Sequence, residues 1–274
     1  MRGASLKSGF VVRSTISSWD SAERFCRQFS LPLLDMQAKH NQEVFQLIFD
    51  HQNVHLLDCR AKKPLTLMVD FVTGSRDHRR KFGGGAGQAV AKAVGVKGNR
   101  TLHVLDATAG LGGDAFVLAC LGSRVTMIER SPVAYALLAD GLKRGLLQAE
   151  EAGDDELLAI LQRMTLVPND GSDWMRDQLA STDIEQPDVV YLDPMFPEKS
   201  KKALAKKEMQ IFQEVVGGDE DADKLFEPAF ALAKYRVVVK RPKIAPLLNG
   251  QEPSVQLVGK SSRFDVYAKK KLPE

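Results

Sequence analysis

Two segments of this chain combine an apolar run, a terminal aspartate and a following turn. The first run ends at Asp106 and leads into a glycine-rich stretch, whereas the second ends at Asp193 and leads into Pro194 and Phe196. A buried parallel strand has this pattern when it delivers a carboxylate to the C-terminal edge of a sheet, which is where open α/β sheets bind ligands. The two segments therefore predict a cofactor loop beside a site for a planar amine.

The glycine stretch matches the pattern G-x-G-x-x-A from Gly110 onwards, and Glu129 ends the next predicted strand. Glycines let the backbone approach a ligand, and an acid at that strand end accepts hydrogen bonds from ribose hydroxyls. A nicotinamide dinucleotide and S-adenosylmethionine (SAM) both suit this loop. Asp106 and Asp114 favour SAM, because they would attract its cationic amino group and repel a pyrophosphate. Asp114 has an alternative role as an acid in the first turn of a helix.

Asp170 and Gly171 follow the third predicted strand. In sheets of this kind the loop after that strand reaches the adenine, where Asp170 would accept a hydrogen bond from the exocyclic amine. An Asp-Gly pair is equally typical of an ordinary turn. The residues alone leave both interpretations open.

The second segment has the residue types that activate an exocyclic base amine. Such an amine is a poor nucleophile, because its lone pair is delocalised into the ring. The Asp193 carboxylate and the Pro194 carbonyl would accept its two protons and offset the developing positive charge, while Phe196 stacks on the base. A plain turn with Phe196 in the core is the alternative. The glycine loop in the same chain favours methyl transfer to a nucleobase.

The composition is that of an ordinary globular protein, with 44% hydrophobic and 27% charged residues. No apolar run reaches the roughly 18 residues of a membrane span, and the first residues make a poor signal peptide. Cys26, Cys59 and Cys120 lack the spacing of a disulfide framework or a metal site. These features predict a cytoplasmic protein with no metal and no membrane partner.

Charge is unevenly distributed, although the net charge is only +3. Residues 217–223 form an acidic stretch that we expect to be a solvated turn. Cations gather in the glycine-rich stretch 74–87, after the second aspartate segment and at a later strand end, where they are suited to RNA phosphates or to a solvated surface. The candidate RNA-binding residues are Arg79, Arg80, Lys81, Lys199, Lys201, Lys202, Lys240 and Arg241.

Strand and helix patterns alternate from residue 100 onwards, which indicates a parallel sheet covered by helices. Residues 1–75 are expected to form a small α+β lobe with helices at 21–29 and 41–49 and a strand at 65–72. Residues 76–274 are expected to form a Rossmann-like α/β domain. Its strands are predicted at 102–106, 124–129, 164–167, 188–193 and 235–240, followed by an antiparallel pair at 254–258 and 264–268.

Four motifs carry a family resemblance: D-A-T-A-G-L-G from Asp106, Y-L-D-P-M-F-P from Tyr191, H-R-R-K-F-G-G-G from His78 and V-V-V-K-R-P from Val237. They closely resemble the J-type ribosomal small-subunit methyltransferases. The resemblance implies a class I SAM-dependent fold, methyl transfer to the N2 amine of a guanine near the 3′ end of 16S rRNA, and S-adenosylhomocysteine as product. Carried over by position, the cofactor contacts are Gly113, Asp114, Glu129, Arg130, Asp170, Gly171 and Asp193, beside Asp106, Gly110 and Gly112 of the loop.

Three other functions compete with this interpretation. A DNA or protein amine methyltransferase would share the Asp193-Pro194 pair. A nicotinamide-dependent oxidoreductase would share the glycine loop, but Asp106 and Asp114 disfavour it. A non-enzymatic RNA-binding or assembly factor is disfavoured because both the loop and the second segment are complete.

Overall fold

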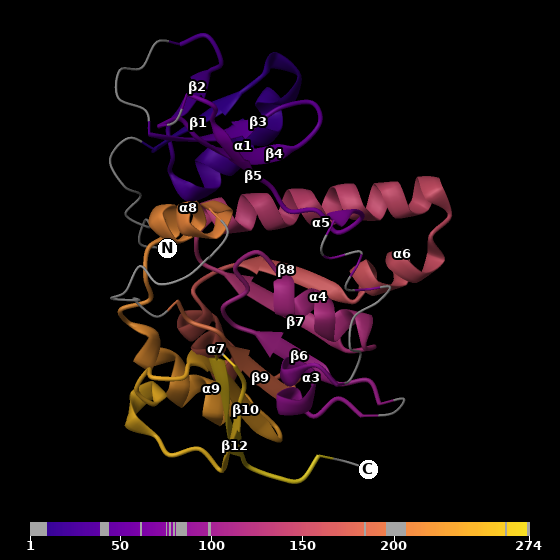
Figure 1. Cartoon of the computed structure of the whole chain (residues 1–274), viewed down its shortest axis with the longest axis vertical. Helices are drawn as coiled ribbons and strands as arrows, with labels where there is room; N and C mark the ends of the chain where they lie inside the picture. The colour runs from indigo at the N-terminus through magenta and orange to yellow at the C-terminus, as the bar shows by residue number, and fades with distance from the viewer. Residues whose placement is uncertain are drawn as a thin grey trace.

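Two β-sheets that follow one another along the chain form the framework of the protein (Figure 1). The computed structural model describes residues 10–38, 44–60, 62–74, 76, 78, 80, 87–97, 100–183, 185–195, 207–260 and 262–272. Within these ranges no helix has the length and apolar character that would carry it across a membrane.

The larger sheet has seven strands in the order β11-β12-β10-β9-β6-β7-β8. Neighbours among β6 to β10 are parallel, whereas β12 is antiparallel to both β10 and β11. The predicted Rossmann-like sheet with an antiparallel C-terminal pair is therefore confirmed. The strands are β6 His103–Asp106, β7 Arg124–Glu129, β8 Met164–Pro168, β9 Val189–Leu192, β10 Arg236–Pro242, β11 Val255–Val258 and β12 Ser262–Ala268.

The order of this sheet reverses at β6, which lies between β7 and β9. Asp106 at the end of β6 is in register with Met127 on one side and with Tyr191 on the other. A reversal of this kind leaves a crevice at the carboxyl ends of the strands. The topology therefore brings both aspartate segments to neighbouring strand ends.

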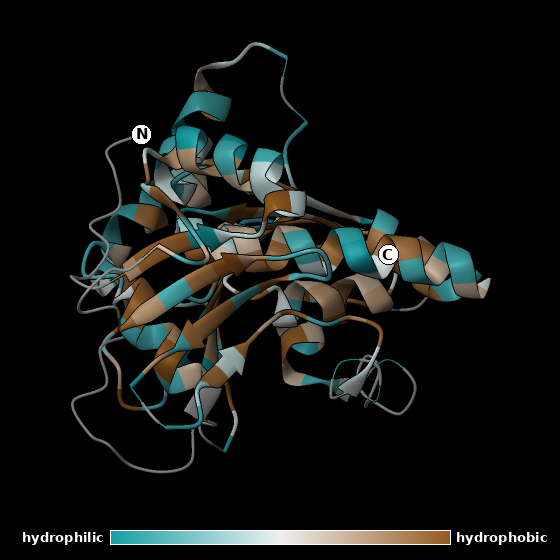
Figure 2. Ribbon diagram, turned by 90° about the horizontal axis from the view of Figure 1, so that it is seen from above, coloured by the Kyte–Doolittle hydropathy of each residue, from teal (hydrophilic) through white to brown (hydrophobic). Residues whose placement is uncertain are grey.

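Each central strand contributes side chains to a hydrophobic core on either face of the sheet, because consecutive residues of a strand face opposite sides. Val104 packs with residues of α3, α4 and α5, whereas Leu105 packs with residues of α7 and α9 (Figure 1). The strands are mostly brown in the hydropathy view, and the helices carry teal residues toward the outside (Figure 2). The helices are α3 Ala89–Val94, α4 Gly113–Cys120, α5 Pro132–Ala152, α6 Asp155–Gln162, α7 Gly171–Ala180, α8 Lys207–Val216 and α9 Phe226–Leu232, with short 3-10 turns at Ala222–Leu225 and Leu248–Gly250.

The N-terminal sheet has five strands in the order β2-β1-β3-β4-β5. The predicted helix at 41–49 is wrong, because Phe45–Phe49 forms β3 between β1 and β4. Phe45 and Leu47 are buried and alternate with the half-buried Gln46, a period that suits a strand. The predicted strand at 65–72 is confirmed only for its first three residues. The elements are β1 Phe10–Ser14, a 3-10 turn Ile16–Ser18, α1 Trp19–Phe29, β2 Leu33–Asp35, β3 Phe45–Phe49, β4 Val54–Asp58 and β5 Leu65–Leu67.

The N-terminal sheet rests on α5, the longest helix described (Figure 1). Gly141 of α5 makes room for Val69, because a Cβ at Gly141 would lie 2.5 Å from Val69 Cγ1 and 2.9 Å from the Val69 carbonyl oxygen. One hydrophobic cluster consequently includes Leu47 of the smaller sheet and Val104 of the larger one. The predicted domain boundary after residue 75 lies between the two sheets. The hydrophobic core, however, is continuous across this boundary. The division into two domains stays a prediction.

Candidate active site

A pocket of about 1090 Å³ lies at the carboxyl edge of the larger sheet. Five neighbouring strands each bring a charged residue to it: Asp106 and Glu129 end β6 and β7, Asp170 and Asp193 follow β8 and β9, and Lys240 lies near the end of β10. The sequence predicted the four acids at these ends, and the structure brings them together. Acids outnumber cations in the pocket lining, and Lys240 is the lysine that lies among the strand-end acids.

The glycine loop presents bare backbone to this pocket. Gly110 and Gly112 have φ values of +54° and +72°, a left-handed conformation that glycine adopts without strain. A Cβ at Gly110 or Gly113 would meet no atom within 4 Å, so this wall is open to a ligand. α4 begins directly after Gly112, and its first two residues, Gly113 and Asp114, line the same pocket.

Glu129 is bound by the backbone of the loop that it faces. Its Oε2 accepts a hydrogen bond from the Gly110 N–H at 2.7 Å, and its Oε1 accepts one from the Ser131 N–H at 2.6 Å. The side chain is buried, which raises the pKa of Glu129 to about 7, against the lowering effect of these two N–H groups. A carboxylate has further lone pairs, so Glu129 can also accept ribose hydroxyls.

Asp106 is the most deeply placed acid of the pocket, with 2% of its surface exposed. Burial, together with the nearby carboxylates of Asp114, Asp193 and Glu129, raises the pKa of Asp106 to about 8. The Thr108 N–H donates to Asp106 Oδ1 at 3.1 Å and partly offsets this. A cationic ligand group would relieve the repulsion among these acids, which agrees with the expected ammonium of SAM.

Lys240 bridges two of the acids. Its Nζ donates to Asp114 Oδ2 and to Asp193 Oδ2, both at 2.8 Å, and the Tyr191 hydroxyl donates to Asp114 Oδ2 at 2.6 Å. Asp114 is in the first turn of α4, and Gly112 holds the cap position of that helix. Burial and Asp114 raise the pKa of Asp193, and the lysine opposes this rise.

The structure gives Lys240 partners within the protein, and its role at RNA phosphates stays a prediction. Its ammonium lies inside the pocket on two carboxylates, and not on an open surface. From the residues alone, Lys240 is only a cation at a strand end. Its contact with Asp193 depends on β10 lying directly beside β9, which the strand order determines.

The segment after β9 is fixed by three hydrogen bonds. The Asp193 N–H donates to Thr108 Oγ1 at 2.6 Å. The Met195 N–H donates to Asp219 Oδ2 at 2.6 Å, and the Asp219 N–H donates to the Met195 carbonyl at 3.0 Å. Asp193, Pro194 and Met195 all line the pocket, whereas Phe196 lies outside the described residues.

Asp219 is a site residue that sequence reasoning missed. It lies in the acidic stretch that we expected to be a solvated turn, yet only 17% of its side chain is exposed. Asp219 Oδ1 pairs with Arg130 Nη2 at 2.5 Å while its other oxygen holds Met195. Part of the acidic turn is therefore the support of the Asp193 segment.

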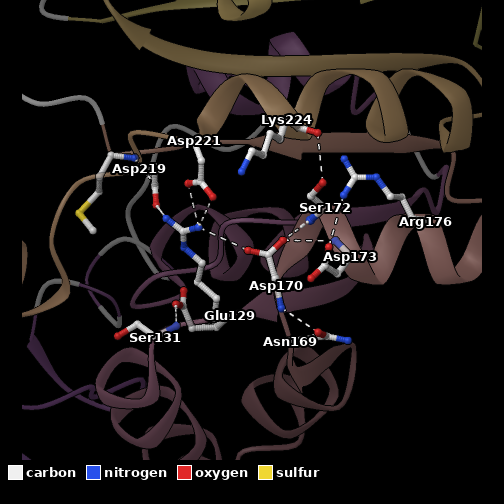
Figure 3. A network of polar contacts seen from close by, with 12 residues as sticks. Glu129, Ser131, Asn169, Asp170, Ser172, Asp173, Arg176, Asp219, Asp221 and Lys224 are labelled. Carbon is white, nitrogen blue, oxygen red and sulfur yellow. Dashed lines mark hydrogen bonds and ion pairs between the residues drawn. The ribbon is translucent and has the colours of Figure 1, made fainter. Parts of the chain in front are cut away.

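Arg130 links Glu129, its neighbour in sequence, to Asp219, which holds the segment after β9. Its Nη1 lies 3.0 Å from Asp221 Oδ1 and 3.4 Å from Asp170 Oδ2, beside its bond to Asp219. Figure 3 shows Asp170, from the segment after β8, converging with Asp219 and Asp221, which come from one acidic stretch. Asp170 also caps α7 by accepting from the Ser172 and Asp173 N–H groups, so the Asp-Gly pair begins a helix and does not form an isolated turn. A contact of Asp170 or Arg130 with a cofactor stays a prediction.

Gly171, the first residue of α7, lets the chain approach β6 closely. A Cβ at this position would lie 2.4 Å from the Ala107 carbonyl oxygen and 3.2 Å from the Ala107 Cβ. We expect Gly171→Ala to lower the free energy of unfolding by about 1–3 kcal/mol, measured by urea denaturation, because backbone must shift. Gly113→Ala is the matched control, since it also begins a helix and its Cβ meets nothing. Equal stabilities for the two variants would contradict the packing argument.

Two further RNA-binding candidates are buried. Arg80 is 5% exposed in its side chain and pairs with Asp154, the N-cap of α6, at 2.8 Å and with Glu156 of its first turn at 2.9 Å. Arg241 is 5% exposed, and its Nε donates to the Pro246 carbonyl. Both cations have partners within the protein in this conformation, and their role as phosphate contacts stays a prediction. Arg79, Lys81, Lys199, Lys201 and Lys202 lie outside the described residues.

Comparison with known proteins agrees with this geometry. Residues 26–269 match the family model described as "Putative SAM-dependent methyltransferase". The chain is 98% identical to Ribosomal RNA small subunit methyltransferase J of Saccharophagus degradans, over 98% of this chain and 100% of that protein. The protein of the same name from Cellvibrio japonicus is 50% identical over 93% of this chain and 95% of its own length. A crystal structure of a SAM-dependent methyltransferase from Neisseria gonorrhoeae is 35% identical, with a TM-score of 0.68, and the match covers 94% of this chain and 95% of that one.

Proposed function

The chain belongs to the SAM-dependent methyltransferases of the ribosomal RNA small subunit methyltransferase J family, and on this premise we propose that it methylates the exocyclic N2 amine of a guanine near the 3′ end of 16S rRNA. The observation that carries this proposal is the Asp193 carboxylate at the end of β9, beside the glycine loop and inside the same pocket. The partner is the small ribosomal subunit or its rRNA, and the protein acts in the cytoplasm.

SAM fits the residues that line the cofactor side of the pocket, and when bound it supplies a methyl group on a cationic sulfur. Asp106 and its acidic neighbours suit the ammonium of the methionine part. Glu129 and Asp170 both line the pocket, where Glu129 would accept the ribose hydroxyls and Asp170 would accept the adenine amine. A pyrophosphate would meet the acids Asp106, Asp114 and Glu129, which disfavours a nicotinamide dinucleotide.

Asp193 and the Pro194 carbonyl would hold the guanine amine. Two acceptors on its two N–H groups turn the nitrogen lone pair toward the methyl donor and offset the charge that develops on nitrogen. A nitrogen–carbon bond forms as the sulfur–carbon bond breaks, and the nitrogen then loses one proton. Asp193 is suited to receive that proton, because burial raises its pKa.

Mapping methylated guanines in 16S rRNA by mass spectrometry tests this function. Ribosomes from cells with and without this protein would be compared, and purified protein would then be added back. We expect one guanine near the 3′ end to lose a methyl group in the deletion and to regain it on addition. Methyl transfer from labelled SAM to the DNA or protein fraction alone would support the alternative amine methyltransferases and contradict the proposal.

The raised pKa of Glu129 predicts a pH dependence of ribose binding. Hydroxyls donate more strongly to the ionised carboxylate, so affinity should rise as pH increases through about 7. 5′-Methylthioadenosine has the ribose hydroxyls and lacks the amino acid, so it isolates Glu129 from Asp106. We expect its affinity in calorimetry to rise by up to ~10-fold between pH ~6 and ~8.

Glu129→Gln is the matched variant for this measurement. It keeps the side-chain volume and removes the titrating group, so its affinity for 5′-methylthioadenosine should be lower at pH ~8 and nearly independent of pH. A variant that retained the wild-type pH dependence would place the titrating group elsewhere.

A further inference from the structure

The turn after β10 is held by a buried arginine. Arg263 Nη1 donates to the Lys243 carbonyl at 2.7 Å, to the Ala245 carbonyl at 2.8 Å and to the Pro242 carbonyl at 3.2 Å. Its Nε bonds to Asp265, which is completely buried. Residues 242–246, which we call the clamped loop, therefore have a backbone fixed by charge-assisted hydrogen bonds.

The clamped loop lies at the rim of the active-site pocket. Its first residue, Pro242, lines the pocket together with Lys240 of the same strand. Two residues later Ile244 has 96% of its surface exposed, although Ala245 beside it is buried. Lys243 precedes it and is also exposed. A fixed backbone thus carries an apolar tip and a cation directly after Pro242, at the rim of the pocket that also contains Asp193.

A single exposed apolar residue is ordinary on a protein surface, so exposure alone has no weight here. Ile244 differs from other exposed apolar residues because its backbone is fixed by Arg263 and because it lies at the rim of the active-site pocket. An enzyme that acts on a base amine in structured RNA must take that base out of its stack, which costs a few kcal/mol. Apolar side chains that enter the stack between bases offset this cost, and isoleucine is one of the residues used in this way.

We propose that Ile244 is a wedge that enters the RNA stack beside the guanine while that base occupies the pocket, with Lys243 on a neighbouring phosphate. This inference rests on the proposed function and adds to it the substrate state, a structured RNA from which one base is extruded. The clamp by Arg263 prevents the wedge from folding back onto the protein when RNA is absent.

Ile244→Ala and Ile16→Ala form a matched pair for the test. Ile16 has 89% of its surface exposed, lies in the N-terminal part of the chain and is not part of the pocket lining. Single-turnover methyl transfer would be measured with saturating SAM on small ribosomal subunits from cells lacking this protein. The same assay would be run on a short single-stranded RNA that carries the same guanine, where the stack is weak.

We expect Ile244→Ala to be roughly tenfold slower than Ile16→Ala on subunits, and the two variants to be nearly equal on the single-stranded RNA. Ile244→Tyr should recover much of the rate, because an aromatic ring also fills a gap in a stack. Equal rates of the two alanine variants on subunits would overturn the wedge and leave the proposed function intact. Absence of transfer by the wild-type protein on both RNAs would overturn the proposed function and the wedge with it.

Lys243→Ala provides a second measurement on the same loop. If the Lys243 ammonium binds one phosphate, its removal should reduce the slope of log affinity against log salt by about one, for binding of the same subunits. An unchanged slope would remove Lys243 from the proposed interface.

Discussion

Asp193→Ala should lower the single-turnover rate of methyl transfer by at least ~100-fold, with SAM and RNA both saturating. Asp193 is the only carboxylate on the Asp193–Met195 segment, and its backbone is fixed by Thr108. Its loss removes a preorganised acceptor for the amine at the point where positive charge develops. Affinity for S-adenosylhomocysteine should change much less than the rate, because the ribose and methionine ends have other partners.

Asp177→Ala is the control for this experiment, since Asp177 is an exposed acid on the outer side of α7 that does not line the pocket. Its rate should equal that of the wild type. If Asp193→Ala also transfers methyl groups at nearly the wild-type rate, the segment after β9 is only a turn and the proposed chemistry is wrong. A large loss of S-adenosylhomocysteine affinity would instead assign Asp193 mainly to cofactor binding.

The sheet and its acidic edge could be predicted because each depends on local sequence. Every central strand is a short apolar run, and Asp106, Glu129 and Asp193 stand at the ends of three such runs. Strand ends of a parallel sheet share one edge, so an acid at a strand end is placed without knowledge of the tertiary structure. The same reasoning identified the glycine loop, whose positive φ values require glycine.

The partners of these acids could not be predicted, because they depend on which strands and loops are neighbours. Lys240 meets Asp193 only because β10 lies beside β9. Asp219 meets Met195 through a turn whose acidic composition is that of a solvent-exposed stretch. In both cases a long-range contact overrides the ordinary behaviour of a charged residue.

The errors near the N-terminus have a related cause. Phe45–Phe49 is a run of mostly apolar residues that fits a short helix as well as a strand, and its place between β1 and β4 decides the question. Arg80 belongs to a basic cluster, and its burial against Asp154 and Glu156 depends on α6, which is remote in sequence. The charge pattern predicted an RNA-binding surface at this cluster, whereas in the structure Arg80 forms ion pairs with acids of the same protein.

Lys240→Met should move the acid limb of the pH–rate profile to higher pH. Burial, Asp114 and Asp219 raise the pKa of Asp193, and Lys240 is the cation that lowers it. Without the ammonium the pKa of Asp193 rises further, so at neutral pH less of it is ionised and able to accept the amine protons. The rate should therefore fall by at least ~10-fold near pH 7 and recover as the pH increases.

Single-turnover rates from pH ~6 to ~9, with saturating SAM and RNA, would measure this shift. Lys240→Arg keeps a cation between Asp114 and Asp193, so its profile should stay close to that of the wild type. If Lys240 had only a structural role, the rate of Lys240→Met would fall by the same factor at every pH.

Because the ammonium occupies Asp193 Oδ2 until the amine arrives, its removal also frees an acceptor. If Lys240→Met is faster than the wild type at high pH, Lys240 competes with the substrate amine for Asp193. If its pH–rate profile is parallel to that of the wild type, Lys240 does not control the ionisation of Asp193.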